Sequence, residues 1–98
     1  MKMKLLGIAA SSALLMTGQI LAADGKAVYD KSCAACHAVL PPKLGDKAAW
    51  APRLKQGADA LVVSVVKGKG MMPAKGGNTI LSEADIRAAV DYMLAELR

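Results

Sequence analysis

The sequence predicts an all-α fold of three to four short helices. Between residues 24 and 98, apolar residues recur at helical spacing in several stretches, and no stretch alternates apolar and polar residues as a β-strand does. Segments rich in glycine and proline separate these stretches and indicate loops. A chain of 98 residues has the size of one domain.

The first 23 residues differ in character from the rest of the chain. Lys2 and Lys4 supply a basic start, and the 19 residues that follow carry no charge. Small residues stand at Ala22 and Ala23, where a signal peptidase would cut. We therefore expect a signal peptide over residues 1–23, cleaved after Ala22 or Ala23.

A retained membrane anchor is the alternative, because 19 uncharged residues are just long enough to span a bilayer. The many Ala, Ser and Gly residues make this stretch weakly hydrophobic, which favours a cleaved signal. Either interpretation places the domain of residues 24–98 outside the cytoplasm, and we expect it in the periplasm.

The charge balance excludes a nucleic-acid-binding protein. The chain has 13 Lys and Arg against 8 Asp and Glu, and removing Lys2 and Lys4 leaves 11 minus 8, or +3. This mild excess forms no dense basic run, and aromatic residues do not interleave with it. No nucleic-acid partner is therefore expected.

Acidic caps predict the first two helices. Asp24 is a plausible N-cap for a helix that ends at Ser32, and Asp46 for a short helix that ends at Gln56. Pro52 fits the first turn of a helix better than its middle. The second helix is therefore expected to be broken or to start late.

The motif C-A-A-C-H follows the first helix and is typical of covalent haem attachment. The thiols of Cys33 and Cys36 have the spacing to add across the two vinyl groups of one haem, and His37 then lies under the iron as its proximal ligand. The chain has no other Cys or His to complete a zinc site, and a redox dithiol is the remaining alternative. We expect one covalent haem c, with its iron, bound by these three residues.

Pro41 and Pro42 give the loop after His37 an extended path. An iron-ligating His usually donates its other ring N–H to a carbonyl, and a proline carbonyl in this loop is one acceptor within reach. Stiffening of a turn is the alternative role for the prolines. Farther on, Trp50 and Arg53 have side chains suited to a haem propionate, or else belong to the core and the solvated surface.

Asp59 is expected to cap a third helix over residues 60–67. Ser82 opens the last helix, and Asp85 three residues later suits a capping box. Met93 lies on the apolar face of this helix and is expected in the core. That face is formed by Ile86, Val90, Met93 and Leu97.

A flexible loop over residues 67–77 carries two methionines, Met71 and Met72. A thioether presented from a loop can occupy the sixth position of a haem iron. Pro73 holds Met72 extended, so Met72 is the expected second axial ligand and Met71 the alternative. Both methionines could instead fill gaps in the core.

The part after the signal peptide has about 75 residues, near the size at which a hydrophobic core alone is marginal. A buried haem would supply the missing apolar bulk. We therefore expect the haem-free chain to be poorly folded.

The chain resembles the class I cytochromes c, and among them the small bacterial cytochrome c5 group. The likeness covers essentially all of residues 24–98. It rests on Cys33-Ala-Ala-Cys-His37, Gly45-Asp-Lys47, Trp50-Ala-Pro-Arg53, Gly70-Met-Met-Pro73, Lys75-Gly-Gly77 and Ala88-Ala-Val-Asp-Tyr-Met93.

The resemblance implies the class I cytochrome c fold, with helices wrapped around one haem. It further implies His37 and Met72 as axial ligands, the Pro42 carbonyl behind His37, and packing of the first and last helices near Gly25 and Tyr92. Relatives in this group usually carry a second cysteine pair after the two glycines. Asn78 and Leu81 stand in those places, so the disulfide is absent and the loop is expected to be looser.

These observations favour a monohaem c-type cytochrome that is not an enzyme: a soluble periplasmic carrier of single electrons between respiratory-chain partners. An iron bound on both faces has no open position for a substrate. A five-coordinate haem protein that binds a gas or acts like a peroxidase is the alternative, and it requires that neither methionine binds the iron. A haem-free binding or thiol-redox module is a third possibility.

The expected partners are redox proteins, a reductase on one side and a terminal oxidase or reductase on the other. Acidic patches on these partners would attract the lysines of the domain. We expect contact with a membrane only through the partners or through an uncleaved N-terminus. The lysines concerned are Lys43, Lys47, Lys55, Lys67, Lys69 and Lys75.

Overall fold

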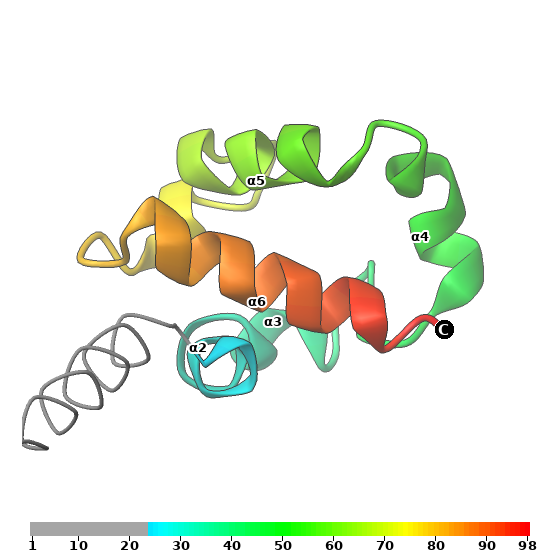
Figure 1. Cartoon of the computed structure of the whole chain (residues 1–98), viewed down its shortest axis with the longest axis horizontal. Coiled ribbons are helices and arrows are strands. Elements are labelled where there is room, and N and C mark those ends of the chain that lie inside the picture. The colour runs from blue at the N-terminus through cyan, green and yellow to red at the C-terminus, as the bar shows by residue number, and fades with distance from the viewer. Residues whose placement is uncertain (1–23) are drawn as a thin grey trace, which may run out of the picture.

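The computed structural model describes residues 24–98, and the predicted signal peptide lies outside this part. The described residues are helical, with one isolated β-bridge between Lys69 and Met72 and no strand. None of the helices in this part is long and apolar enough to cross a membrane. The elements in Figure 1 are α2 (Gly25–Ser32), α3 (Ala34–His37), α4 (Lys47–Leu54), α5 (Ala58–Lys67), the 3₁₀-helix η1 (Ala74–Gly77) and α6 (Glu83–Ala95).

Helices α2 and α6 cross at close range (Figure 1). A Cβ at Gly25 would collide with the carbonyl oxygen of Ala88, so only glycine permits this approach. The rings of Tyr29 and Tyr92 lie 5.4 Å apart at an angle of 47° beside the crossing. The packing near Gly25 and Tyr92 that the resemblance implies is confirmed.

Side-chain caps begin the first and last helices as predicted. The Asp24 carboxylate accepts a hydrogen bond from the amide of Ala27, and α2 ends at Ser32. The Ser82 hydroxyl accepts from the amide of Asp85, whose carboxylate accepts from the amide of Ser82. This reciprocal pair satisfies two N–H groups that the start of α6 would otherwise leave free.

Helix α4 is continuous through Pro52, so the expectation of a broken or late helix is wrong. The Asp46 carboxylate caps it at the amide of Ala49, and it ends at Leu54, two residues before the predicted end. Proline removes one intrahelical hydrogen bond, and burial of the Trp50 side chain, which is 8% exposed, holds the helix in place.

Helix α5 begins earlier than predicted, and Asp59 is not its cap. Gly57 is the N-cap, with φ 89° and ψ 157°, and Asp59 lies in the first helical turn. The Asp59 carboxylate accepts instead from Arg87 of α6 across 2.9 Å. A backbone angle that favours glycine therefore determines where this helix starts.

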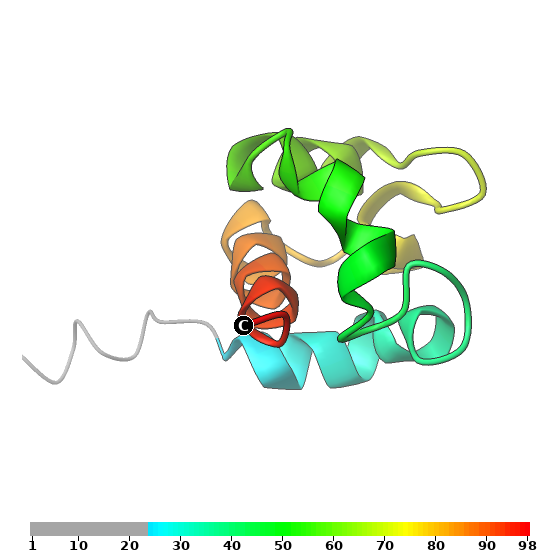
Figure 2. The same ribbon diagram turned by 90° about the vertical axis from the view of Figure 1, so that its right-hand side faces the viewer.

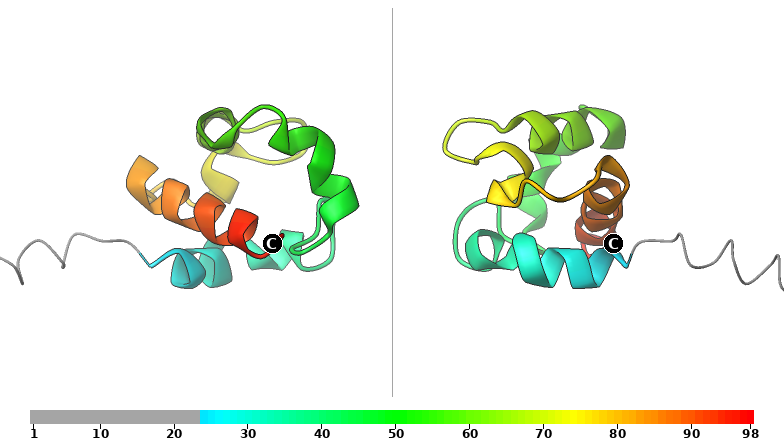
Figure 3. Two further views of the ribbon diagram at one scale, coloured as in Figure 1. Left: turned by 45° about the vertical axis from the view of Figure 1, so that its right-hand side comes forward. Right: turned by 90° about the vertical axis from the view of Figure 1, so that its left-hand side faces the viewer.

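Two clusters of buried side chains connect the helices. One joins α5 to α6, and the other joins α2, α4 and α6. Figure 2 and Figure 3 show α5 on one side of the interior and α2 with α3 on the other, with α4 and α6 between them. The first cluster comprises Leu61, Val62, Ile86 and Val90, and the second Tyr29, Trp50 and Met93.

Candidate haem site

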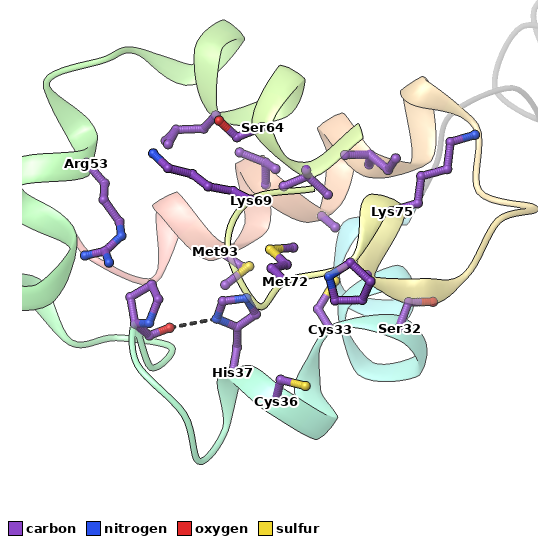
Figure 4. A pocket seen from close by; sticks show the side chains of 18 of the residues that line it. Ser32, Cys33, Cys36, His37, Arg53, Ser64, Lys69, Met72, Lys75 and Met93 are labelled. Carbon is purple, nitrogen blue, oxygen red and sulfur yellow. Dashed lines mark hydrogen bonds between the residues drawn. The ribbon is translucent and has the colours of Figure 1, made fainter. Parts of the chain in front are cut away.

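The helices enclose a cavity of about 530 Å³, within the range of about 300–1,000 Å³ typical of cofactor sites. Every helix of the described part contributes to its lining, and most lining side chains are apolar. Figure 4 shows the side chains that face it. Among them are Cys33, Cys36, His37 and Met72, so the structure brings all four predicted site residues to one cavity.

The single turn of α3 presents the two thiols. Cys33 caps the turn, and the amide of His37 donates to the Cys33 carbonyl across 3.0 Å. Burial raises the pKa of the Cys33 thiol, and the nearby Cys36 adds to this effect.

The imidazole of His37 is oriented by the loop that follows it. Its Nδ1 lies 2.8 Å from the carbonyl oxygen of Pro42. A carbonyl oxygen only accepts, so Nδ1 carries the proton and Nε2 keeps its lone pair for a metal. The amide of Leu44 donates back to the His37 carbonyl across 2.9 Å and closes the loop. The predicted proline acceptor is confirmed, and it is Pro42.

The two neighbouring methionines have different surroundings. Lys69 and Met72 exchange two backbone hydrogen bonds of 2.9 and 3.0 Å, which places Gly70 and Met71 at the tip of a tight turn. Met71 is fully exposed there. Met72 is half-buried, and its side chain extends into the cavity, as does that of His37 (Figure 4). The turn therefore directs the Met72 thioether into the cavity and leaves the Met71 thioether in solvent.

Comparisons with known proteins agree with this geometry. A family model described as cytochrome c oxidase, cbb3-type, subunit III matches residues 21–93. Cytochrome c-555 of Chlorobaculum tepidum is 52% identical over 95 residues, covering 87% of this chain and 88% of the relative. Cytochrome c5 of Azotobacter vinelandii is 38% identical over 77 residues, covering 74% and 93%.

A solved structure gives the same result for the fold. It is a crystal structure of an electron transfer complex of nitrite reductase with cytochrome c, and it matches this chain with a TM-score of 0.72 and 53% identity. The match covers 76% of this chain and 94% of the other. The chain belongs to the class I cytochromes c. Its predicted fold is confirmed, and so are its covalent haem c with iron and its role as a monohaem electron carrier rather than a gas-binding protein.

The residues of this cytochrome fit a covalently bound haem. Two thiols at the attachment spacing, an imidazole with a free Nε2 and an inward thioether face one apolar cavity. These donors are the Cys, His and Met side chains that hold c-type haem. Within residues 24–98, no group of three or more His, Cys, Asp or Glu offers a competing metal site.

Of the two interpretations of Trp50, the structure supports the buried core residue. Its Nε1 donates to the carbonyl oxygen of Lys43 across 2.9 Å, so the indole fixes the loop between α3 and α4. Arg53 lines the cavity and uses Nη1 on the carbonyl of Ala49. The other N–H groups of Arg53 could still donate to a haem propionate, and this contact stays a prediction. Met93 is 6% exposed and packs in the core, as expected.

The loop after η1 is tied down by contacts that sequence reasoning missed. Asn78 Nδ2 donates to the Ser32 hydroxyl across 3.0 Å, and Lys75 Nζ donates to the carbonyl oxygen of Leu81 across 3.0 Å. The Leu81 side chain packs against the core between α5 and α6. These two bonds hold the loop without a disulfide, and no local signal in the sequence predicts either of them. That the loop is looser than in relatives with the disulfide stays a prediction.

Proposed function

We propose that this cytochrome is an exported single-electron carrier in which Cys33 and Cys36 attach the haem and His37 and Met72 bind its iron. The observation that carries the proposal is the convergence of two thiols, a free imidazole nitrogen and an inward thioether on one apolar cavity. When bound, the haem iron supplies a reversible change between its ferric and ferrous states.

The protein side chains orient the iron ligand, set the reduction potential and leave the iron no open position. Pro42 holds the His37 ring in one tautomer and one orientation. A thioether from Met72 favours the reduced iron and raises the reduction potential. Because the protein provides a ligand on each face, the site has no open position for a substrate, and we infer that the domain is not an enzyme.

The optical spectrum of the oxidised holoprotein tests the ligand set. Methionine ligation produces a weak near-infrared sulfur-to-iron band. We expect the band in the unaltered protein and in Met71→Ala, where the lost thioether is fully exposed, and its disappearance in Met72→Ala. A haem protein that lacks the band and readily binds carbon monoxide would instead have an open sixth position, and the proposed ligation by Met72 would fail.

Export forms the second part of the proposal. We infer that residues 1–23 are a signal peptide cleaved after Ala22 or Ala23 and that the domain works in the periplasm. Asp24 caps α2, so a cut at either place leaves the first helix intact. The intact mass of holoprotein purified from whole cells, membranes included, tests this inference. A mass that still includes all 98 residues would support the retained anchor.

Redox proteins are the proposed partners, one reducing and one oxidising this carrier. A similar chain is found in a crystal structure of an electron transfer complex with nitrite reductase. This complex supports a redox protein as the partner. Exposed Lys69 and Met71 lie at the rim of the cavity, where a partner would approach the haem. We propose that acidic patches on the partners meet the lysines of this surface.

A further inference from the structure

We propose that Lys75 and Asn78 are positioning residues for Met72: their side chains form a two-armed clamp that holds the Met72 loop against α2 and α6. We call this pair of hydrogen bonds the loop clamp. The inference rests on the proposed function, in which Met72 binds the iron. It adds that the strength of this ligation depends on side chains that do not touch the cofactor.

The first arm joins the loop to the start of α6. Lys75 Nζ donates to the carbonyl oxygen of Leu81 across 3.0 Å, at a partly buried position. Leu81 is anchored in the core and directly precedes Ser82, the cap of α6. The ammonium therefore ties a loop to a rigid part of the fold.

The backbone of Lys75 supports this interpretation. Its φ of 57° and ψ of 28° lie in the left-handed region, and Lys75 is the one residue other than glycine with positive φ in the described part. A lysine adopts this conformation at a cost that glycine avoids. Such strain persists only where surrounding contacts hold it, and the bond to Leu81 is a contact of that kind.

The second arm joins the loop to the end of α2. Asn78 Nδ2 donates to the Ser32 hydroxyl across 3.0 Å, although the two residues are 46 positions apart. Ser32 is the last residue of α2 and directly precedes Cys33. A Cβ at Gly76 would lie 3.1 Å from the Ser32 carbonyl, so the two backbones also meet closely. This arm links the Met72 loop to the helix end that carries the first attachment cysteine.

The segment between the arms and α5 is compact. A Cβ at Gly68 would lie within 3.0 Å of the amide nitrogen of Ala74 and at 3.0 Å from the Met72 carbonyl, so the loop folds back on itself. Figure 4 shows Lys75 and Ser32 on the same side of the cavity, opposite Arg53. With the loop compact and both arms closed, the backbone that carries the Met72 thioether is held in place.

Competition by an external ligand measures the clamp directly. Imidazole binds a ferric haem only when the Met72 thioether has left the iron, so its apparent Kd reports how often the loop opens. We expect Lys75→Leu to bind imidazole about 10- to 100-fold more tightly, because a hydrogen bond from a charged group is lost. Asn78→Leu should show about a 3- to 10-fold effect. Lys75→Arg, which keeps charged donors, should restore most of the original affinity.

Two further variants serve as a substitute for Lys75→Leu and as a control. Lys75→Gly accepts the left-handed backbone without strain, so it folds even if Lys75→Leu does not, and it should also bind imidazole more tightly. Lys31→Leu removes an exposed lysine from the end of α2 and should leave the affinity unchanged. The urea midpoint of each holoprotein separates local opening of the loop from a loss of global stability.

The outcomes distinguish the clamp from the ligand assignment. If Met72→Ala abolishes the near-infrared band while Lys75→Leu and Lys75→Gly bind imidazole like the unaltered protein, the clamp is wrong and the assignment stands. If the unaltered holoprotein lacks the band, both are wrong. Tighter imidazole binding in both Lys75 variants at an unchanged urea midpoint supports the clamp.

Discussion

Gly25 of α2 lies so close to the carbonyl oxygen of Ala88 in α6 that a Cβ at residue 25 would overlap this oxygen. The glycine is needed here for space and not for a special backbone angle, since its φ is not positive. The Tyr29 and Tyr92 rings extend the same contact at a centroid distance of 5.4 Å. This crossing holds α2, and with it the attachment motif, against the last helix.

Replacing Gly25 by alanine should therefore destabilise the holoprotein. In an open helix the change would stabilise by about 0.5–1 kcal/mol, because glycine has more conformational freedom to lose. The collision with Ala88 should reverse the sign and cost about 1–3 kcal/mol. Urea unfolding measures the free energy, and Lys31→Ala on the exposed side of α2 serves as the control. A more stable Gly25→Ala would mean that the helices separate without cost.

Met93 is the third methionine near the site, and its variant should affect stability without affecting ligation. The side chain is 6% exposed and packs with Tyr29 and Trp50. Truncation in Met93→Ala leaves a cavity and should cost about 2–5 kcal/mol. The near-infrared band should remain, since Met72 supplies the proposed ligand. Met71→Ala, at a fully exposed position, should change neither quantity. If Met93→Ala were the only methionine variant to lose the band, Met93 and not Met72 would be the ligand.

Features decided by local chemistry could be predicted from the sequence. The attachment motif is read from three residues within one turn, and the caps at Asp24 and Ser82 are contacts within three residues of the chain. The inward position of Met72 was also predicted, because Pro73 restricts the residue before it. In each case the interaction that decides the structure lies nearby in the sequence.

Features decided by distant partners could not be predicted. Asp59 looked like a helix cap, but its carboxylate pairs with Arg87, 28 residues later. The Trp50 N–H looked available to a propionate, but the path of the preceding loop brings the Lys43 carbonyl to it. The loop clamp has the same origin, since Asn78 reaches a hydroxyl 46 residues away.

Removal of the haem should leave a poorly folded chain. The cavity of about 530 Å³ is bordered by Leu61, Ile86 and Val90, three of the four buried residues in the core between α5 and α6. Without the haem, these apolar side chains would face water and lose burial that a small domain needs for its marginal stability. The variant Cys33→Ala/Cys36→Ala, purified without haem, should show weak near-UV circular dichroism and no cooperative melt. A cooperative, native-like melt would contradict this expectation.

Electron transfer to an acidic partner should slow as salt is added. The lysines named as docking residues take part in neither of the two ion pairs formed within residues 24–98. Except for Lys75, whose ammonium donates to the Leu81 carbonyl, their charge is available to attract a partner. Screening shortens the reach of that attraction to about 10 Å at 0.1 M salt and about 3 Å at 1 M. We expect the second-order rate constant to fall by about tenfold or more over this range.

A matched pair of variants locates the steering charge. Lys69 is exposed at the rim of the cavity, and Lys69→Gln should slow electron transfer at low salt with little effect at high salt. Lys26 lies on α2 and is already paired with Asp30 at 2.8 Å, so Lys26→Gln should leave the rate nearly unchanged. Stopped-flow kinetics with an acidic redox protein across a salt series measures both effects. Rates that do not depend on salt, or equal effects of the two variants, would show that the cavity rim does not steer the encounter.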